Sequence, residues 1–135
     1  MNKVGTFRNI EEAREFFKGD RFAAANGMTI DEMYDDGCLC SMTVREDHRN
    51  AIGGIMGGVI YTLADFAYAV CANNDHMATV ALDASVRFLR MSKGTRLFAR
   101  SKTVKTGKTT DVVSIMVTDD QGKEIALVTI TGYKL

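Results

Sequence analysis

The sequence has little of what marks nucleic-acid-binding or membrane proteins. Basic and acidic residues number 17 each, so the formal net charge is zero. Proteins that bind nucleic acid usually carry a basic surplus, which argues against such a partner here. The chain also lacks an apolar run of about 18 residues, the length that a membrane-spanning helix needs. We therefore expect neither a nucleic-acid partner nor a membrane partner.

Export and metal-binding signals are also missing. Residues 1–17 contain no apolar core of the kind found in signal peptides. Three cysteines, an odd number, fit a reducing compartment better than a disulfide framework. Cys38 and Cys40 lie two apart on a predicted strand, but a zinc site would need further ligands, and the only histidines in the sequence are His48 and His76. These features predict a cytoplasmic protein in which the cysteines are buried apolar side chains and not metal ligands.

The order of predicted elements indicates the fold class. A length of 135 residues suits a single domain over residues 1–135, and the absence of proline means that no cis-proline can slow folding. Asn9, with Glu12 three residues later, predicts the start of a helix that runs to about Phe17. Residues 20–26 favour a further helical turn. The remaining elements are two strands joined by a turn, a long helix and four more strands, at residues 28–34, 38–45, 59–72, 80–89, 97–104, 111–118 and 125–133.

The long helix at 59–72 is apolar on nearly every face, so it must be buried on most sides. Alternating apolar residues and short turns between successive strands predict an antiparallel meander. One large antiparallel sheet then has to cover the helix. The sequence therefore predicts an α+β fold, with a sheet wrapped round one central helix and a short N-terminal helix.

Asp65 is the only charged residue between Asn50 and Asn74, and it lies in the middle of this apolar helix. Burial of an ionised carboxylate is unfavourable unless the group is paired or functional. Burial should raise its pKa, which suits a general base. The alternative is a structural carboxylate satisfied by a tyrosine or a backbone group of a neighbouring element. Position alone does not decide between these interpretations.

A glycine-rich loop at 50–58 leads into the helix and ends in Gly57 and Gly58. The first N–H groups of a helix lack intrahelical partners and lie at the positive end of its dipole. Glycines there let a substrate carbonyl approach, as in an oxyanion hole, although tight packing against the sheet is the alternative. Gly57 and Asp65 are eight residues apart, about 12 Å along a helix. The antiparallel helices of a two-fold dimer could therefore share a site more easily than one chain could form it.

Several short motifs resemble a known family. They are His48-Arg49-Asn50, Gly53, Met56-Gly57-Gly58, Leu63-Ala64-Asp65, and VALDASVRFLR at 80–90. Together they resemble the hotdog-fold thioesterases of the phenylacetic-acid-degradation (PaaI-like) type, over about residues 20–134. The family pattern is an asparagine, a glycine, a histidine with two glycines, and an aspartate eight residues beyond the first glycine of that pair.

The resemblance implies an acyl-CoA thioesterase that works as a homodimer or a dimer of dimers. It implies no metal, and no cofactor beyond the coenzyme A of the substrate. Asp65 would be the general base or nucleophile. The Gly57 amide of the partner chain would polarise the thioester carbonyl, and Asn50 would help to hold that carbonyl or the attacking water.

Two departures from the family pattern leave a second function open. Met56 stands where the family has the histidine that supports the loop. Ala81 stands where the family often has a serine or threonine that orients water, with Thr79 the nearest hydroxyl. The alternative function is a non-catalytic acyl-CoA-binding or regulatory protein. A hotdog dehydratase or hydratase ranks last, because neither the helix nor the glycine-rich loop contains a histidine.

Candidates for substrate binding are spread along the chain. Basic side chains could hold the phosphates of coenzyme A, although each could equally belong to a solvated sheet face. Residues of the helix and the loop could line an acyl pocket, although each could equally belong to the core. The candidates are Met56, Gly58, Tyr61, Phe66, Tyr68, Ala81, Arg87, Arg90, Lys93, Lys102, Lys105 and Lys108.

Overall fold

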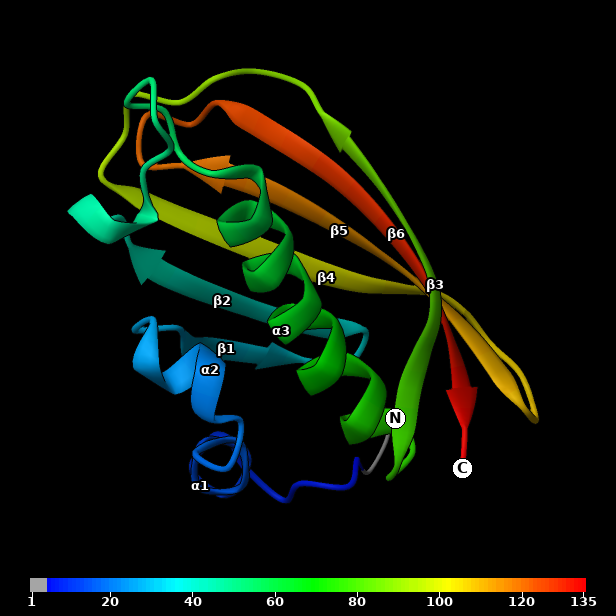
Figure 1. Ribbon diagram of the computed structural model, residues 1–135. Helices are drawn as coiled ribbons and strands as arrows, with labels where there is room; N and C mark the ends of the chain where they lie inside the picture. Colours follow the sequence, from blue (N-terminus) through cyan, green and yellow to red (C-terminus); the bar gives the residue numbers. More distant parts are fainter. Residues whose placement is uncertain (1–4) are drawn as a thin grey trace.

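The computed structural model describes residues 5–135, and Figure 1 shows the course of the chain. Residues 1–4, which the sequence assigns to the same domain, lie outside the described residues. The helices are α1 (Ile10–Phe17), α2 (Arg21–Ala25), the short 3-10 helix η1 (Glu46–His48) and α3 (Gly57–Asp75). The strands are β1 (Thr29–Tyr34), β2 (Gly37–Thr43), β3 (Thr79–Phe88), β4 (Arg96–Thr106), β5 (Thr110–Asp119) and β6 (Glu124–Lys134).

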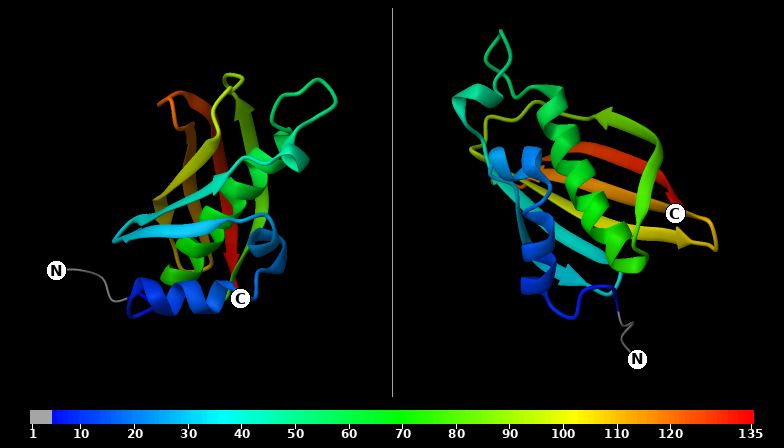
Figure 2. Two further views of the ribbon diagram at one scale, coloured as in Figure 1. Left: turned by 90° about the vertical axis from the view of Figure 1, so that its left-hand side faces the viewer. Right: turned by 60° about the horizontal axis from the view of Figure 1, so that its bottom comes forward.

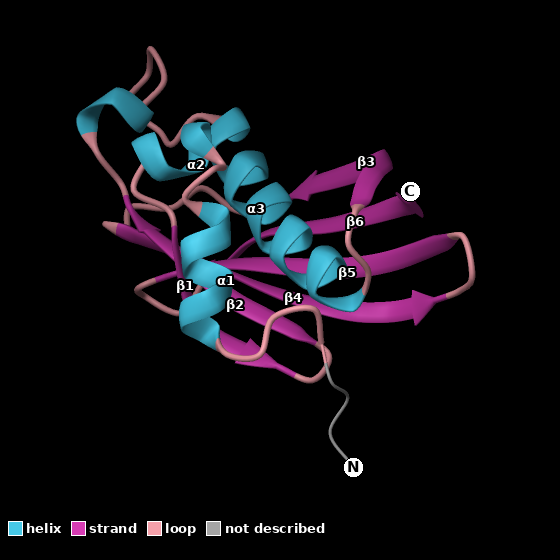
Figure 3. Ribbon diagram, turned by 90° about the horizontal axis from the view of Figure 1, so that it is seen from below, coloured by secondary structure: helices cyan, strands magenta, loops and turns pink. Residues whose placement is uncertain are grey.

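The six strands form one antiparallel sheet in the order β1-β2-β4-β5-β6-β3. The sheet curves round α3, which crosses its inner face (Figure 1). The helices α1 and α2 lie on the same side of the sheet as α3, close to β1 (Figure 3). This arrangement confirms the predicted α+β fold. Among residues 5–135, no helix is both long enough and apolar enough to cross a membrane.

Local hydrogen bonds explain where the helices begin and end. The Asn9 side chain accepts the Glu12 N–H at 2.9 Å, which confirms the predicted cap of α1. The helix α3 is longer at both ends than the predicted 59–72, because the glycine pair forms its first turn and Asn73 extends its last. The Asn73 amide donates to the Ala69 carbonyl at 2.9 Å and accepts the backbone N–H at the start of β3. The end of α3 is therefore tied directly to the first strand that follows it.

The predicted meander is wrong for β3. This strand pairs with β6 at the edge of the sheet instead of with β4, and only β4, β5 and β6 form a meander. The connection at 89–95 crosses the end of the sheet, and its Leu89 N–H donates to the Ile125 carbonyl at 2.8 Å. A connection of this length lacks the tight turn that forces two consecutive strands to pair. As a result, β4 pairs with β2 instead.

The core lies between α3 and the inner face of the sheet. Ten residues of α3 are buried, among them Leu63, Ala67 and Val70 with no exposed surface. From β2, the alternating side chains that begin with Cys38 point into this core, as the sequence predicted. Beyond its first turn, α3 leaves one face partly accessible, made of Tyr61, Thr62, Asp65 and Ala69. We call these four residues the accessible face of α3.

Core packing against α3 predicts a clear stability difference between two valines. Val113 on β5 is fully buried, whereas Val104 on β4 is exposed. Val113→Ala should lower the free energy of unfolding by about 2 kcal/mol, because it removes two buried methyl groups. The matched change Val104→Ala should alter it by less than about 0.5 kcal/mol. Urea denaturation at one protein concentration checks both values, and equal costs would contradict the assigned core.

Candidate functional site

Asn50 organises the glycine-rich loop that precedes α3. Its side-chain oxygen accepts the backbone N–H groups of Ile52 and Gly54, at 3.1 and 3.0 Å. Its own N–H donates to the Gly54 carbonyl at 2.7 Å, and Gly53 has a φ of +88°, which favours glycine. The loop stands out from the body of the molecule (Figure 2). The Asn50 oxygen is thus occupied, and its amide nitrogen is the group left to donate to a substrate.

Gly57 is the first residue of α3, directly after the N-cap residue Met56. The Met56 carbonyl accepts the Val59 N–H at 3.0 Å, whereas the hydrogen bonds of the described residues include none from the Gly57 N–H. A Cβ atom at Gly57 would lie only 3.1 Å from the Phe88 ring. This N–H lies at the positive end of the helix dipole, so it can polarise a carbonyl group placed beside Phe88.

A cavity of about 440 Å³ opens beside this end of α3. Its wall brings together three predicted site residues, Asn50, Gly57 and Arg90. Most of the wall is apolar, with isoleucines from the loop and α3 on one side and Phe88, Leu89 and Met91 on the other. Asp65 does not line this cavity, in line with a separation of about 12 Å along the helix from Gly57.

Asp65 is half-buried on the accessible face of α3. Within residues 5–135, no hydrogen bond or ion pair reaches its carboxylate. Burial raises the pKa of Asp65 above its ordinary value, and the negative charge of Asp20 raises it further. The same carboxylate contributes to a raised pKa of the Tyr61 hydroxyl, after the larger effect of burial. No tyrosine among the described residues donates a hydrogen bond to Asp65. The alternative interpretation, a structural carboxylate held by a neighbouring element, therefore has no support within the described chain.

Tyr68 lies in the core and not at the cavity. Its side chain is 2% exposed, and its hydroxyl donates to Asp111 on β5 at 3.0 Å. A side chain at Gly132 would collide with both partners, so glycine makes the room for this pair. The structure therefore does not bring Tyr68 together with Asn50 and Gly57.

The other predicted site residues are dispersed. Met56 is 55% exposed at the N-cap of α3, and Gly58 is exposed beside it. Ala81 is exposed on β3 at an irregularity in the pairing with β6. The nearby Thr79 hydroxyl donates to the His76 carbonyl at 2.6 Å and is therefore already engaged. Within one chain, Lys108 lies in the turn between β4 and β5, at the other end of α3 from Gly57.

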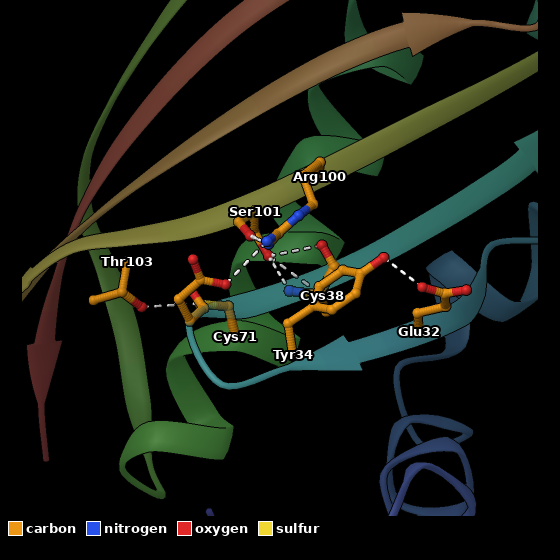
Figure 4. Close-up of polar contacts among 8 residues, drawn as sticks. Glu32, Tyr34, Cys38, Cys71, Arg100, Ser101 and Thr103 are labelled. Atoms are coloured by element: carbon orange, nitrogen blue, oxygen red, sulfur yellow. Dashed lines mark hydrogen bonds and ion pairs between the residues drawn. The ribbon is translucent and has the colours of Figure 1, made fainter. Parts of the chain in front are cut away.

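Cys38 and Cys71 lie in a polar network between α3, β2 and β4 (Figure 4). All three cysteines are free and buried, which confirms the prediction that they are core side chains. Cys38 contacts the Ser101 hydroxyl at 3.1 Å, and Cys71 contacts the Thr103 hydroxyl at 3.3 Å. Burial raises the pKa of the Cys71 thiol to about 11, so this thiol is a poor nucleophile. No cluster of three metal-ligating side chains occurs among the residues that the structure describes.

The sequence did not predict two residues of the cavity wall, Phe88 and Ser92. Phe88 was assigned only to a strand, and its contact with Gly57 depends on β3 returning to the helix from the far edge of the sheet. Ser92 lies in the cavity wall, where its hydroxyl donates to Asp119 at 2.5 Å and accepts the Gly94 N–H at 3.0 Å. The residues Asp119-Asp120-Gln121-Gly122 indicate a hairpin turn, but they do not indicate that Asp119 contacts Ser92, 27 residues earlier in the chain.

The placement of Tyr68 predicts an effect on stability without an effect on substrate binding. Tyr68→Phe leaves the buried Asp111 carboxylate without its hydroxyl donor, which should cost about 1–3 kcal/mol of unfolding free energy. The control Tyr61→Phe changes a hydroxyl on the accessible face of α3 and should cost less than about 0.5 kcal/mol. Thermal or urea unfolding measures both. An unchanged stability together with an altered KM in Tyr68→Phe would place this residue at the substrate instead.

Known proteins match both the sequence and the fold. The family model of the Thioesterase superfamily matches residues 52–126. The acyl-coenzyme A thioesterase PaaI of Escherichia coli is 31% identical over 118 residues, which cover 87% of this chain and 84% of the relative. The solved structure of E. coli PaaI has a TM-score of 0.86 at 29% identity and covers 91% of this chain and 90% of that one. A variant of PaaI from Thermus thermophilus has a TM-score of 0.80 at 30% identity, over 84% and 98% of the two chains. The chain therefore belongs to the thioesterase superfamily, as a PaaI-like thioester hydrolase with the hotdog fold.

Proposed function

We propose that the protein hydrolyses acyl-CoA thioesters to the free acid and coenzyme A. The observation that carries this proposal is Asp65, a half-buried carboxylate without a partner in the described chain and with a raised pKa. Such a group accepts a proton more readily than an ordinary carboxylate, which suits a general base. The name of the E. coli relative, an acyl-coenzyme A thioesterase, supports acyl-CoA as the class of substrate.

Asp65 and the Gly57 amide supply two complementary parts of the reaction. As general base, Asp65 takes a proton from a water molecule while that water attacks the thioester carbonyl carbon. The Gly57 N–H stabilises the negative charge that develops on the carbonyl oxygen. The C–S bond then breaks, and the sulfur of coenzyme A leaves with the electron pair and takes up a proton. As nucleophile, Asp65 would instead attack the carbonyl itself, and water would hydrolyse the resulting anhydride.

The two groups would meet across a dimer interface. The accessible face of α3 carries no charge other than Asp65, which suits contact with a second helix. At the edge of the sheet, β3 pairs on one side only, and Leu82 and Phe88 on it are 62% and 57% exposed. A strand with one edge unpaired and with exposed apolar side chains is typical of a surface that pairs with another chain. In a two-fold dimer formed this way, Gly57 of one chain would act with Asp65 of the other, and two such dimers could associate further.

The coenzyme A portion of the substrate calls for basic side chains at the mouth of the cavity. Arg90 is the best placed, because it is exposed in the cavity wall and its guanidinium donates a hydrogen bond to the Glu124 carbonyl at 3.0 Å. Lys108 could serve only a site that the partner chain completes. The proposal includes no metal and no resident cofactor. The cytoplasmic location and the lack of a nucleic-acid partner remain predictions from the sequence.

Met56 favours one alternative, the binding of acyl-CoA without hydrolysis. It stands in the position of the family histidine, and a thioether can neither donate a hydrogen bond nor carry a proton to the leaving group. Release of free thiol from a panel of acyl-CoAs separates the two functions. Turnover supports hydrolysis, whereas saturable binding with no turnover on any substrate supports the alternative.

Replacing Asp65 should abolish most turnover without unfolding the protein. Asp65→Asn is expected to lower kcat by at least about 10²-fold, because the amide cannot accept the proton. The variant should unfold at no lower a temperature than the wild type at neutral pH, because a carboxyl whose pKa is raised by folding destabilises the folded state when ionised. Wild-type activity should fall as the pH drops through this raised pKa. Thiol-release kinetics and thermal unfolding measure these effects, with the exposed Asp35→Asn as control.

The role of the Gly57 amide can be tested by removing its hydrogen atom. Proline lacks an N–H but is well tolerated at the first position of a helix, and the extended backbone of Met56, with φ −60° and ψ 133°, is compatible with a following proline. Gly57→Pro should lower kcat by about 10²-fold or more relative to Gly57→Ala. The alanine variant keeps the N–H while it adds a Cβ atom next to Phe88. Equal activity of the two variants would contradict a role for the amide.

A further inference from the structure

His48 closes the short helix η1 at a point where three parts of the chain meet. Its side chain is 2% exposed. Its ring nitrogen Nδ1 accepts the Arg45 N–H at 2.9 Å, and Nε2 lies 3.0 Å from the Asn26 side-chain oxygen at the end of α2. Its backbone carbonyl accepts the Met56 N–H at 2.9 Å. His48 therefore joins α2, the chain that leaves β2, and the N-cap of α3.

The hydrogen bonds determine where the ring carries its proton. The Asn26 amide nitrogen donates to the Phe22 carbonyl at 2.9 Å, which turns the Asn26 oxygen towards His48. An oxygen at that position can only accept, so Nε2 carries the hydrogen. A backbone N–H can only donate, so Nδ1 facing Arg45 must keep its lone pair. The site thus accommodates one form of the side chain, the neutral ring with its proton on Nε2.

The position of the Gly57 amide depends on this junction. Met56 precedes Gly57, and its N–H is held by the His48 carbonyl. Next to this hydrogen bond, an isolated antiparallel β-bridge between Arg49 and Ile55 closes the base of the loop. Residues 51–53 of the loop are exposed, the Asn50 side-chain oxygen accepts only from other loop residues, and Ile55 is partly buried against the core. His48 is therefore a fully buried residue at which the loop base and the first turn of α3 are attached to the body of the protein.

We propose that His48 is a positioning residue for the reaction, whose neutral ring holds the loop base and thereby the Gly57 N–H in the geometry that receives the thioester carbonyl. The proposal rests on the function proposed above for Gly57. His48 does not touch the substrate in this account. It lies behind the N-cap of α3 and does not line the cavity.

Protonation of His48 would oppose this geometry. A second ring proton, on Nδ1, would face the Arg45 N–H at 2.9 Å, so two donors would meet. Among the described residues, the charged groups that face the ring are Arg45 and Asp47, which precede it in the chain and pair with each other at 3.1 Å. From α2 only the uncharged Asn26 side chain reaches the ring, and from α3 only the Met56 backbone reaches this residue.

The direction of the pH effect follows from these surroundings. Burial and the positive charge of Arg45 lower the pKa of His48 below its ordinary value, against a smaller opposite effect of Asp47. The neutral ring therefore stabilises the folded state fully above the ordinary histidine pKa. This stabilisation is lost as the pH falls through the lowered pKa of the folded state. Loosening of the loop base should accompany that loss.

Two substitutions separate the positioning role from simple burial. His48→Asn places an oxygen near the position of Nδ1, so it keeps an acceptor for the Arg45 N–H but cannot be protonated. His48→Phe fills the space without an acceptor and leaves that buried N–H unpaired. The control is His76→Asn, which changes the other histidine, at the far end of α3, where Nε2 lies 3.1 Å from the Leu135 carbonyl.

The first measurements do not require activity. Nitrogen chemical shifts of the wild-type ring should report the form with hydrogen on Nε2 at neutral pH. Exchange of the Met56 amide hydrogen should be faster by about 10-fold or more in His48→Phe than in wild type, and close to wild type in His48→Asn. Exchange should also accelerate below the His48 pKa in wild type but not in His48→Asn. Hydrogen on Nδ1, or unchanged Met56 exchange in His48→Phe, would overturn the proposal.

Kinetics then connect the junction with the reaction. In His48→Phe, kcat should fall by about 10-fold or more with little change in KM, while His48→Asn restores most of kcat. A normal kcat in His48→Phe would overturn the positioning role. If no variant and no wild-type preparation releases thiol, the proposed function has failed, whereas the exchange and shift measurements still decide whether His48 holds the loop base.

Discussion

The burial of α3 beneath the curved sheet is the constraint on which the rest of the structure depends. A nearly uncharged helix has to be covered on most sides, and six antiparallel strands supply that cover. Only the accessible face remains for polar chemistry, and Asp65 is the single ionisable carboxylate on it. The apolar surroundings that stabilise the fold are the same ones that raise the pKa of this carboxyl. Stability and the basicity of the candidate catalytic group therefore have a common origin.

At the N-terminus of α3 the candidate group is a backbone N–H and not a side chain, and neighbouring residues hold it accessible. Asn50 shapes the loop, Phe88 limits the space beside Gly57, and His48 anchors the loop base to α2. Glycine at the first position of the helix leaves a polarised N–H accessible at the cavity. The candidate base and the polarised amide thus lie on one helix, about 12 Å apart along its axis, and the proposed mechanism therefore takes them from two different chains.

Much of the fold could be predicted because its signals are local. The cap at Asn9, the alternation in β2 and the apolar run of α3 each correspond to an observed element. The pairing of β3 could not be predicted, because its partner β6 is distant in sequence and no turn residue specifies that contact. The aromatic residues show the same limit. The sequence places Tyr68 on the central helix, but only the packed structure shows that its hydroxyl donates to Asp111 and does not face the cavity.

The candidate site divides in the same way. Asp65, Gly57 and Asn50 stand out in the sequence because an isolated charge and a glycine-rich loop are local patterns. His48 begins the motif His48-Arg49-Asn50, but the sequence does not reveal its hydrogen bonds to Asn26, Arg45 and Met56, which lie at different distances along the chain. The central claim is that Asp65 of one chain acts with Gly57 of another, and mixing two inactive variants tests it most directly. Asp65→Asn and Gly57→Pro chains, co-expressed in equal amounts, should recover about a quarter of the wild-type turnover per chain, because about half of the dimers that form at random are mixed and each mixed dimer has one intact site of two. No recovery from mixed dimers that are shown to form would contradict the shared site.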